Sequence, residues 1–200
     1  AAQLLSSNVS EAERPLTDLI VNESLRIRDL LDQVEVFSDE RAPELSSLNI
    51  HEVLQYTIQV ARAGFASHVK FVERYDPSLP EALSHHDALV QVFLNIIKNA
   101  SEALSQVEHP TITITTAYQS GLKFSDKKLP LVVNISDNGR GIPADVRAKL
   151  FEPFASTKAH GRGLGLAVVA KLASDLRAMV ECDDPGSKEG ASFTVRLSSA

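Results

Sequence analysis

The stretch LPLVVNISDNGRGIP, residues 129–143, runs from an apolar segment directly into an acid and two closely spaced glycines. The run LPLVVNIS has the composition of a strand, and Asp137 stands where that strand is expected to end. A carboxylate in this position can accept a hydrogen bond from a ligand amine, while Gly139 and Gly141 let backbone come close to a flat ring. A plain turn stabilised by the side chains of Asp137 and Asn138 is the other interpretation.

The segments on either side of this stretch mix strand and helix patterns. TITITTAY, residues 111–118, alternates between polar and apolar residues and is expected to pair antiparallel with LPLVVNIS. Helical periodicity covers residues 50–63, which end at Gly64, and residues 87–104. The other expected elements are a strand at 69–75, a loop at 122–128, a short helix at 144–150, a helix at 164–174, and strands at 179–182 and 191–197. This irregular order predicts an α+β fold with helices on one face of a sheet.

A different pattern occupies the N-terminal part of the chain. Over residues 16–37, positions that are apolar except for Glu23 recur at alternating steps of four and three, which predicts a helix with an apolar seam. The charged, Pro- and Ser-containing segment SDERAPELSS, residues 38–47, predicts a linker. We therefore expect residues 1–42 to form a partial helical hairpin of a dimerisation bundle, and residues 48–200 to form a separate domain.

The overall composition describes an ordinary globular chain. Its 200 residues are 44% hydrophobic and carry a formal net charge of -6, which argues against a surface that binds nucleic-acid phosphates. A single cysteine, Cys182, cannot form an internal disulfide. Its thiol is expected to be reduced, as in a cytoplasmic protein. No apolar run is long enough to suggest a membrane span, so neither a membrane nor a nucleic-acid partner is expected. The uncapped apolar start AAQLLSS predicts a fragment whose upstream residues have been removed.

Asn95 and Asn99 form a pair of amides on the helix predicted at residues 87–104. Four residues apart, they project from the same side of that helix, beside its apolar face. Hydrogen bonds inside the core are one explanation for the pair. The other is that an amide oxygen binds a hard cation such as Mg²⁺, which takes oxygen donors and substrate phosphates.

The glycine-rich stretch FASTKAHGRGLGLAVVA, residues 154–170, precedes a predicted helix. Gly161, Gly163 and Gly165 leave backbone N–H groups open beside the helix N-terminus, an arrangement that suits an anion. The polar and charged side chains that accompany them are Thr157, Lys158 and Arg162. The stretch is neither a Walker loop nor a dinucleotide fingerprint placed after a strand.

Taken together, four strings resemble the ATP-binding domain of sensor histidine kinases. They are similar in order and separation to that family's N, G1, F and G2 boxes, and they are NIIKNASEAL (95–104), DNGRGIP (137–143), FEPFAS (151–156) and GRGLGL (161–166). The resemblance covers residues 48–200 and implies the Bergerat fold. That fold is a two-layer, ATP-binding sandwich of helices on a mixed sheet, shared with gyrase, Hsp90 and MutL ATPases. ATP and Mg²⁺ are the implied ligands.

By the same resemblance, Asn99 corresponds to the Mg²⁺ ligand and Asp137 to the acceptor of the adenine amine. Phe151 and Phe154 would anchor a mobile lid. The full set of implied ATP-binding residues is Asn95, Asn99, Asp137, Gly139, Gly141, Ile142, Phe154, Thr157, Lys158, Gly161, Arg162, Gly163, Leu164, Gly165, Leu166 and Thr194.

The sequence departs from the family pattern in two places. GASFTVRL, residues 190–197, resembles the last glycine box, but Ala191 stands where Thr or Ser is usual, so a hydroxyl contact to adenine is lost. Thr194 is the expected substitute. SDLRA, residues 174–178, stands where a His-Gly-Gly turn is common, which leaves the conformation of that helix end open.

Asn95 also separates the reactions within the superfamily. ATP-hydrolysing members usually carry a Glu there as general base, and an amide cannot take the proton of an attacking water, so transfer to a histidine imidazole is implied. None of the 6 histidines has the family's phosphoacceptor motif, H-E-x-x-[NT]-P. HEVLQ, which begins at His51, lacks the Pro and is interpreted as a helix start with an exposed His. The phosphoacceptor is therefore expected upstream of Ala1.

Longer strings resemble the nitrogen-regulation kinases of the NtrB type. These strings are LVQVFLNIIKNASEAL, FASTKAHGRGLGLAVVAKL and AGFASHVKFVERYDPSLP, and AAQLL is similar to the segment just downstream of the phosphoacceptor in that subfamily. The implied partners are an NtrC-like response regulator and a PII-type signalling protein, with a homodimer in the full-length protein. A stand-alone ATPase of the same fold and a nonenzymatic scaffold with a structural nucleotide are the competing hypotheses.

Overall fold

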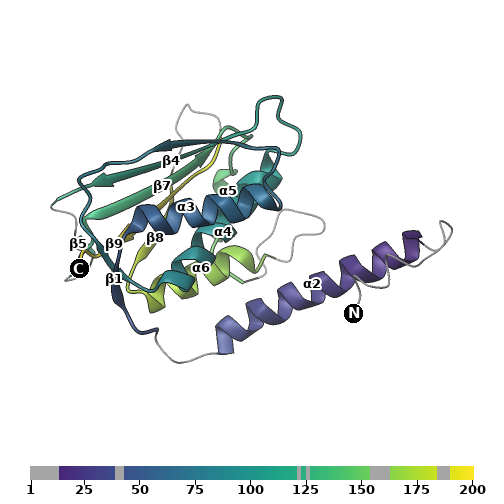
Figure 1. Cartoon of the computed structure of the whole chain (residues 1–200), viewed down its shortest axis with the longest axis horizontal. Coiled ribbons are helices and arrows are strands. Elements are labelled where there is room, and N and C mark those ends of the chain that lie inside the picture. The colour runs from purple at the N-terminus through teal and green to yellow at the C-terminus, as the bar shows by residue number, and fades with distance from the viewer. Residues whose placement is uncertain (1–13, 39–42, 121–122, 125–126, 154–162, 184–189) are drawn as a thin grey trace. The chain divides into compact units, whose positions relative to one another are not determined.

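The computed structural model describes residues 14–38, 43–120, 123–124, 127–153, 163–183 and 190–200 (Figure 1). Contacts between Cα atoms divide the chain into two compact units, residues 1–40 and residues 41–200. The division falls inside the segment 38–47, where the sequence predicts a linker.

The described part of the first unit is the long helix α2 (Arg14–Ser38), which confirms the helix predicted over residues 16–37. Five apolar side chains of its seam are between 51% and 64% exposed, namely Leu16, Leu19, Ile20, Ile27 and Leu31. The preceding helix of the predicted hairpin lies outside the described residues. None of the described helices combines the length and the apolarity that are needed to span a membrane.

The second unit is built on a five-stranded sheet with the order β2-β4-β7-β9-β8. Its strands are β2 (Lys70–Arg74), β4 (Thr111–Tyr118), β7 (Leu131–Asp137), β8 (Met179–Asp183) and β9 (Ser192–Leu197). β2 pairs parallel with β4, and the other neighbouring strands pair antiparallel. The predicted antiparallel pairing of β4 with β7 is confirmed, and it aligns Ile112 with Asp137.

Helices cover one face of this sheet (Figure 1). They are α3 (Ile50–Ala63), α4 (His86–Ala103) and α6 (Gly165–Asp175), together with the short α5 (Ala144–Arg147). α4 is central, because it contacts α3, α6, β4 and β7. Phe93 and Ile97 of α4 are buried, as are Ile114 and Ile135 of the sheet, so the core lies between the two layers. The predicted α+β fold, a mixed sheet with helices on one face, is confirmed.

The structure corrects several predicted elements. The segment 122–128, expected to be a loop, contains two short paired strands, β5 (Lys123–Phe124) and β6 (Lys127–Lys128). The short helix predicted at residues 144–150 already ends at Arg147. A further two-stranded sheet joins β1 (Ser46–Leu48) to β3 (Ala82–Ser84). The sequence does not predict it, because such short strands cannot show an alternating pattern.

His51, predicted to be exposed, is partly buried instead. Its ring stacks on Tyr75 with centroids 4.8 Å apart, and its Nε2 lies 3.0 Å from the hydroxyl oxygen of Thr116. Burial lowers the pKa of His51, and the nearby Asp76 carboxylate acts in the opposite direction. The prediction was wrong because the start of α3 lies against residues of β4 and of the segment after β2, a contact that a local helix pattern does not reveal.

Arg177 closes the end of α6 in the left-handed region, with φ 56°. Its N–H donates to the carbonyl oxygen of Ser174 at 3.0 Å, and the N–H of Ala178 donates to that of Ala173 at 2.8 Å, which is the pattern of a Schellman cap. A non-glycine residue in the left-handed region costs the folded state about 1–2 kcal/mol, a cost that glycine avoids. The greater conformational entropy of glycine in the unfolded chain offsets roughly half of this gain. Arg177→Gly is therefore expected to raise the free energy of unfolding by roughly 0.5–1 kcal/mol. Urea denaturation measures this change, and an unchanged or lower midpoint would contradict it.

Candidate functional site

Asp137, the last residue of β7, lies on the helix-covered side of the sheet. It alternates with Val133 and Ile135, which are both buried in the core, and it is itself only 9% exposed. The N–H of Gly139 donates to its Oδ1 at 2.8 Å, and the N–H of Ala191 donates to the same oxygen at 3.2 Å. Within the described part of the chain both bonds end on Oδ1, which leaves Oδ2 for a donor from a ligand.

The electrostatic setting of this carboxyl group is unusual for an aspartate. Burial raises the pKa of Asp137, and the hydrogen bonds from Gly139 and Ala191 act in the opposite direction. A buried carboxylate is costly unless it is paired or fully hydrogen-bonded. A ligand N–H that reaches Oδ2 would supply the missing bond, so the site suits a ligand that presents an amine.

The backbone around Asp137 is packed so closely that side chains are excluded. Gly190 has φ +100°, and a Cβ there would lie 1.9 Å from the carbonyl oxygen of Asp137. Gly141 has φ +74°, and a Cβ there would lie 3.0 Å from the carbonyl oxygen of Gly190. These glycines are needed for the packing of the turn itself. The predicted approach of Gly139 and Gly141 to a ligand ring stays a prediction.

Asn95 and Asn99 face the start of α6. A Cβ on Gly165 would lie 3.9 Å from Nδ2 of Asn99 and 4.0 Å from Oδ1 of Asn95. Nδ2 of Asn95 is buried and has no hydrogen-bond partner among the described residues. Leaving a buried amide donor unsatisfied costs about 1–3 kcal/mol. A ligand with acceptor oxygens, such as a phosphate, would satisfy this donor.

The turn after Asp137 packs on the same helix, further along. A Cβ on Gly139 would lie 3.5 Å from the carbonyl oxygen of Ala103 and 3.7 Å from its Cβ. Asn99 precedes Ala103 by roughly one helical turn, a rise of about 6 Å. Asp137, Asn99 and the start of α6 are therefore gathered around the C-terminal half of α4.

The N-terminus of α6 adds a place for negative charge. Its N-cap residue, Leu164, makes no side-chain hydrogen bond to the helix. The N–H groups of the first turn and the helix dipole together favour an anion there. Among the described residues, no group of His, Cys, Asp and Glu has the arrangement of a metal site. Amide oxygens, such as that of Asn99, and the oxygens of the anion itself are ligands that a hard cation accepts.

Thr194 is not brought together with Asp137. It alternates along β9 with Phe193 and Val195, whose side chains are buried in the core beneath the helices. Its neighbour across the sheet is Asn134 of β7, which likewise alternates with core residues. Thr194 therefore lies on the sheet face that is turned away from the helices and from Asp137.

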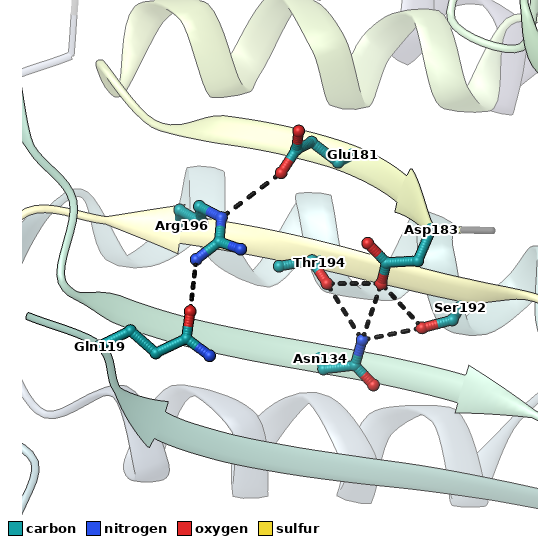
Figure 2. A network of polar contacts seen from close by, with 7 residues as sticks. All are labelled: Gln119, Asn134, Glu181, Asp183, Ser192, Thr194 and Arg196. Atoms are coloured by element: carbon teal, nitrogen blue, oxygen red, sulfur yellow. Dashed lines mark hydrogen bonds and ion pairs between the residues drawn. The ribbon is translucent and has the colours of Figure 1, made fainter. Parts of the chain in front are cut away.

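A polar network occupies that opposite face (Figure 2). The hydroxyl of Thr194 donates to Asp183 Oδ2 at 2.6 Å and accepts from Nδ2 of Asn134 at 3.0 Å. Ser192 also donates to Asp183, at 2.9 Å. This placement contradicts the predicted contact between Thr194 and a ligand ring, so the hydroxyl that is missing at Ala191 has no substitute there.

Part of the predicted lid cannot be placed, because Phe154, Thr157, Lys158, Gly161 and Arg162 lie outside the described residues. Of the other implied ATP-binding residues, Leu164 is buried, whereas Ile142, Gly163 and Leu166 are half-buried. Phe151 packs edge-on against Phe193, with ring centroids 6.5 Å apart. The role of Phe151 as a lid anchor stays a prediction.

Three residues shape the site in addition to the ATP-binding residues that the resemblance implied. Gly190 and the backbone of Ala191 hold Asp137, and Asn138 makes hydrogen bonds beside it. The pairing of β9 with β7 is the signal that could have identified the first two, because it aligns Ser192 with Ser136 next to them.

Comparisons with known proteins identify the family of the chain. The model of the family described as histidine kinase-, DNA gyrase B-, and HSP90-like ATPase matches residues 84–200. The chain is 48% identical over 189 residues to the sensory histidine kinase/phosphatase NtrB of Azospirillum brasilense, which covers 92% of this chain and 47% of that protein. For NtrB of Rhizobium meliloti (strain 1021) the identity is 48% over 194 residues, covering 94% and 51%. For NtrB of Escherichia coli O157:H7 it is 32% over 204 residues, covering 98% and 56%. The chain thus spans about half the length of the curated relatives it matches.

Solved structures share the fold. Full-length ShkA in complex with AMPPNP superposes with a TM-score of 0.79 at 22% identity, covering 100% of this chain and 42% of that one. Histidine kinase ThkA in complex with the response regulator protein TrrA gives a TM-score of 0.73 at 20% identity, covering 96% and 53%. At these identities the likeness concerns the fold alone.

Proposed function

Because the chain belongs to the family of histidine kinase-, DNA gyrase B- and HSP90-like ATPases, we propose that Asp137 and Asn99 bind the two ends of one ATP molecule. Asp137 accepts the adenine amine on Oδ2, and Asn99 holds a Mg²⁺ ion through its amide oxygen. The N-terminus of α6 receives the phosphates. The observation that supports this most strongly is the buried, unpartnered Nδ2 of Asn95, a residue whose Oδ1 lies toward Gly165, because a phosphate oxygen is the acceptor that Nδ2 lacks.

The reaction that we propose is transfer of the γ-phosphoryl group of ATP to a histidine. ATP supplies the phosphoryl group, and Mg²⁺ neutralises its charge. The residues of this chain contribute positioning: Asp137 orients the base, and Asn99 and the start of α6 orient the phosphates. Asn95 stands at the position where ATP-hydrolysing relatives have a Glu as general base. Its amide cannot activate water. Bound ATP is thereby kept for an imidazole nucleophile.

The resemblance to NtrB proteins supports a place in nitrogen regulation. We propose that the phosphoryl group passes from the histidine to an NtrC-like response regulator, and that a PII-type protein controls the kinase. The exposed apolar seam of α2 supports a homodimer, since such a surface is usually covered by another helix. A cytoplasmic location belongs to the same proposal.

A transfer experiment tests the kinase assignment. The chain is mixed with γ-labelled ATP, Mg²⁺ and a full-length NtrB subunit whose own nucleotide site has been inactivated but whose phosphoacceptor histidine is intact. Label on that histidine is the expected result, and an Asn99→Ala version of the chain should transfer far less. Steady phosphate release without labelled histidine would instead favour a stand-alone ATPase, and ATP binding with neither reaction would favour a scaffold.

The raised pKa of Asp137 predicts a pH dependence of nucleotide binding. Affinity for ATP is expected to fall as the pH is lowered through that pKa, because protonation replaces the acceptor of the adenine amine by a donor. The effect on folding has the opposite sign. The folded state holds this proton more tightly than the unfolded chain, so the stability contributed by protonated Asp137 is lost as the pH rises through the folded-state pKa.

Calorimetric titration of wild type and Asp137→Asn at several pH values measures this effect. Protonation of the ATP phosphates affects the affinities of both proteins alike. Its effect therefore cancels in the ratio of the two affinities. The ratio is expected to shrink toward one at low pH. A ratio that does not change with pH would show that Asp137 is not the titrating acceptor.

A further inference from the structure

We propose that Asn138 is a positioning residue that fastens the Asp137 turn to the loop between α4 and β4, and so fixes the spacing between the two ends of the nucleotide site. The inference rests on the proposed function, because it takes Asp137 and Asn99 to hold one ligand. Its observable basis is a set of hydrogen bonds between Asn138 and the entry to β4.

Asn138 is exposed, yet its side chain is hydrogen-bonded at both ends. Oδ1 accepts the N–H of Thr111 at 2.8 Å, and Nδ2 donates to the carbonyl oxygen of His109 at 2.9 Å. The backbone N–H of Asn138 also donates to the carbonyl oxygen of Thr111, at 3.2 Å. One amide group therefore joins the residue after β7 to both sides of Pro110.

The loop that Asn138 reaches leads back to the helix that carries Asn99. That helix, α4, ends at Ala103, and the next residue, Leu104, is fully buried and donates its N–H to the carbonyl oxygen of Ala100 at 3.0 Å. The loop is thus anchored where it leaves the helix. From the other direction, Gly139 packs directly on Ala103. These contacts connect the end of α4, through the loop and Asn138, to the Asp137 turn. The turn itself packs on α4 through Gly139.

An amide suits this position because the two bonds need one acceptor and one donor on the same side chain. Asn138→Ala removes both bonds. Asn138→Asp keeps an acceptor for Thr111 but places a carboxylate oxygen against the carbonyl oxygen of His109. Both variants retain the backbone bond, so they test the side chain alone.

Calorimetric titration with ATP and Mg²⁺ tests the proposal. Because Asn138→Ala loses both side-chain hydrogen bonds that hold the turn, it is expected to bind ATP about tenfold more weakly than wild type. Asn138→Asp is expected to be weakened as well. Asn49→Ala is the matched control, because Asn49 is also an exposed amide, which accepts the N–H of His51 at 3.0 Å as the N-cap of α3. Its affinity for ATP is expected to equal that of wild type.

A second ligand separates positioning from general loosening of the turn. Adenosine contacts only the Asp137 end, so Asn138→Ala should weaken ATP binding more than adenosine binding. Equal losses for both ligands would overturn the proposal, and so would wild-type affinity for ATP or an equal loss in Asn49→Ala. The proposed function is tested apart from this by Asp137→Asn and Asn99→Ala. If those two lose ATP binding and Asn138→Ala does not, only the positioning role fails.

Discussion

Replacing Gly190 by Ala is expected to lower the free energy of unfolding by about 4 kcal/mol or more, an unusually large effect for one methyl group. A Cβ at Gly190 would lie 1.9 Å from the carbonyl oxygen of Asp137 and 2.8 Å from its carbonyl carbon. Both atoms are backbone, so no side-chain rotation relieves the clash. The φ of +100° adds strain that any residue with a Cβ would carry. Urea denaturation of wild type and variant gives the difference.

Gly64→Ala is the matched control for this substitution. Gly64 ends α3 with φ -120°, and the nearest atom to a Cβ there is the carbonyl oxygen of Val60 at 3.5 Å, an ordinary contact. The control is expected to change stability by less than about 1 kcal/mol. If Gly190→Ala were as stable as Gly64→Ala, the close approach of Gly190 to Asp137 would be wrong, and with it the geometry of the carboxylate.

Asp137→Asn is expected to weaken ATP binding by roughly 10- to 100-fold, because a hydrogen bond to a charged acceptor contributes about 1.5–3 kcal/mol. The carbamoyl oxygen can still accept the N–H groups of Gly139 and Ala191. Its NH₂ group then occupies the place of Oδ2 and faces the adenine amine. Because both groups are donors, no hydrogen bond forms between them. Titration calorimetry with ATP and Mg²⁺ measures the loss.

The same substitution should leave the fold intact. Because burial raises the pKa of Asp137, the folded protein prefers a neutral side chain there, and the uncharged amide of the variant satisfies that preference. The urea midpoint at neutral pH is therefore expected to stay equal or to rise while binding is lost.

Asp183→Asn is the matched control for this carboxylate. Asp183 lies in the polar network on the opposite sheet face (Figure 2), where it accepts bonds from Ser192 and Thr194. Its replacement should not change the affinity for ATP. If both variants bound ATP as wild type does, Asp137 would not be the base-recognising residue.

Much of the fold was predictable because its signals are local. α3 begins after an Asn whose side chain caps it and ends at Gly64, and both features can be read directly in the sequence. β4 alternates strictly between polar and apolar residues, as a strand with one covered face must. β1 and β3 have no such signal, because their pairing joins residues that are far apart in the chain.

The site was predictable in its residue types and only partly in its geometry. Asn95, Asn99 and Asp137 could be picked out by motif order, and the structure gathers them around α4. The wrong prediction that Thr194 contacts the ligand ring has a physical cause. The register of β9 against β7 decides on which face of the sheet Thr194 lies, and a shift of one residue would place it on the other face. The clash that forbids a side chain at Gly190 is likewise a long-range contact, invisible in a local pattern.

Whether Asp137 and Asn99 hold one ligand is tested most directly by comparing adenosine with ATP–Mg²⁺ in both single variants. Calorimetry is expected to show that Asp137→Asn weakens both ligands, whereas Asn99→Ala weakens ATP–Mg²⁺ and leaves adenosine at wild-type affinity. Wild-type affinity for ATP–Mg²⁺ in both variants would contradict the shared site, as would a loss of adenosine binding in Asn99→Ala equal to its loss of ATP binding.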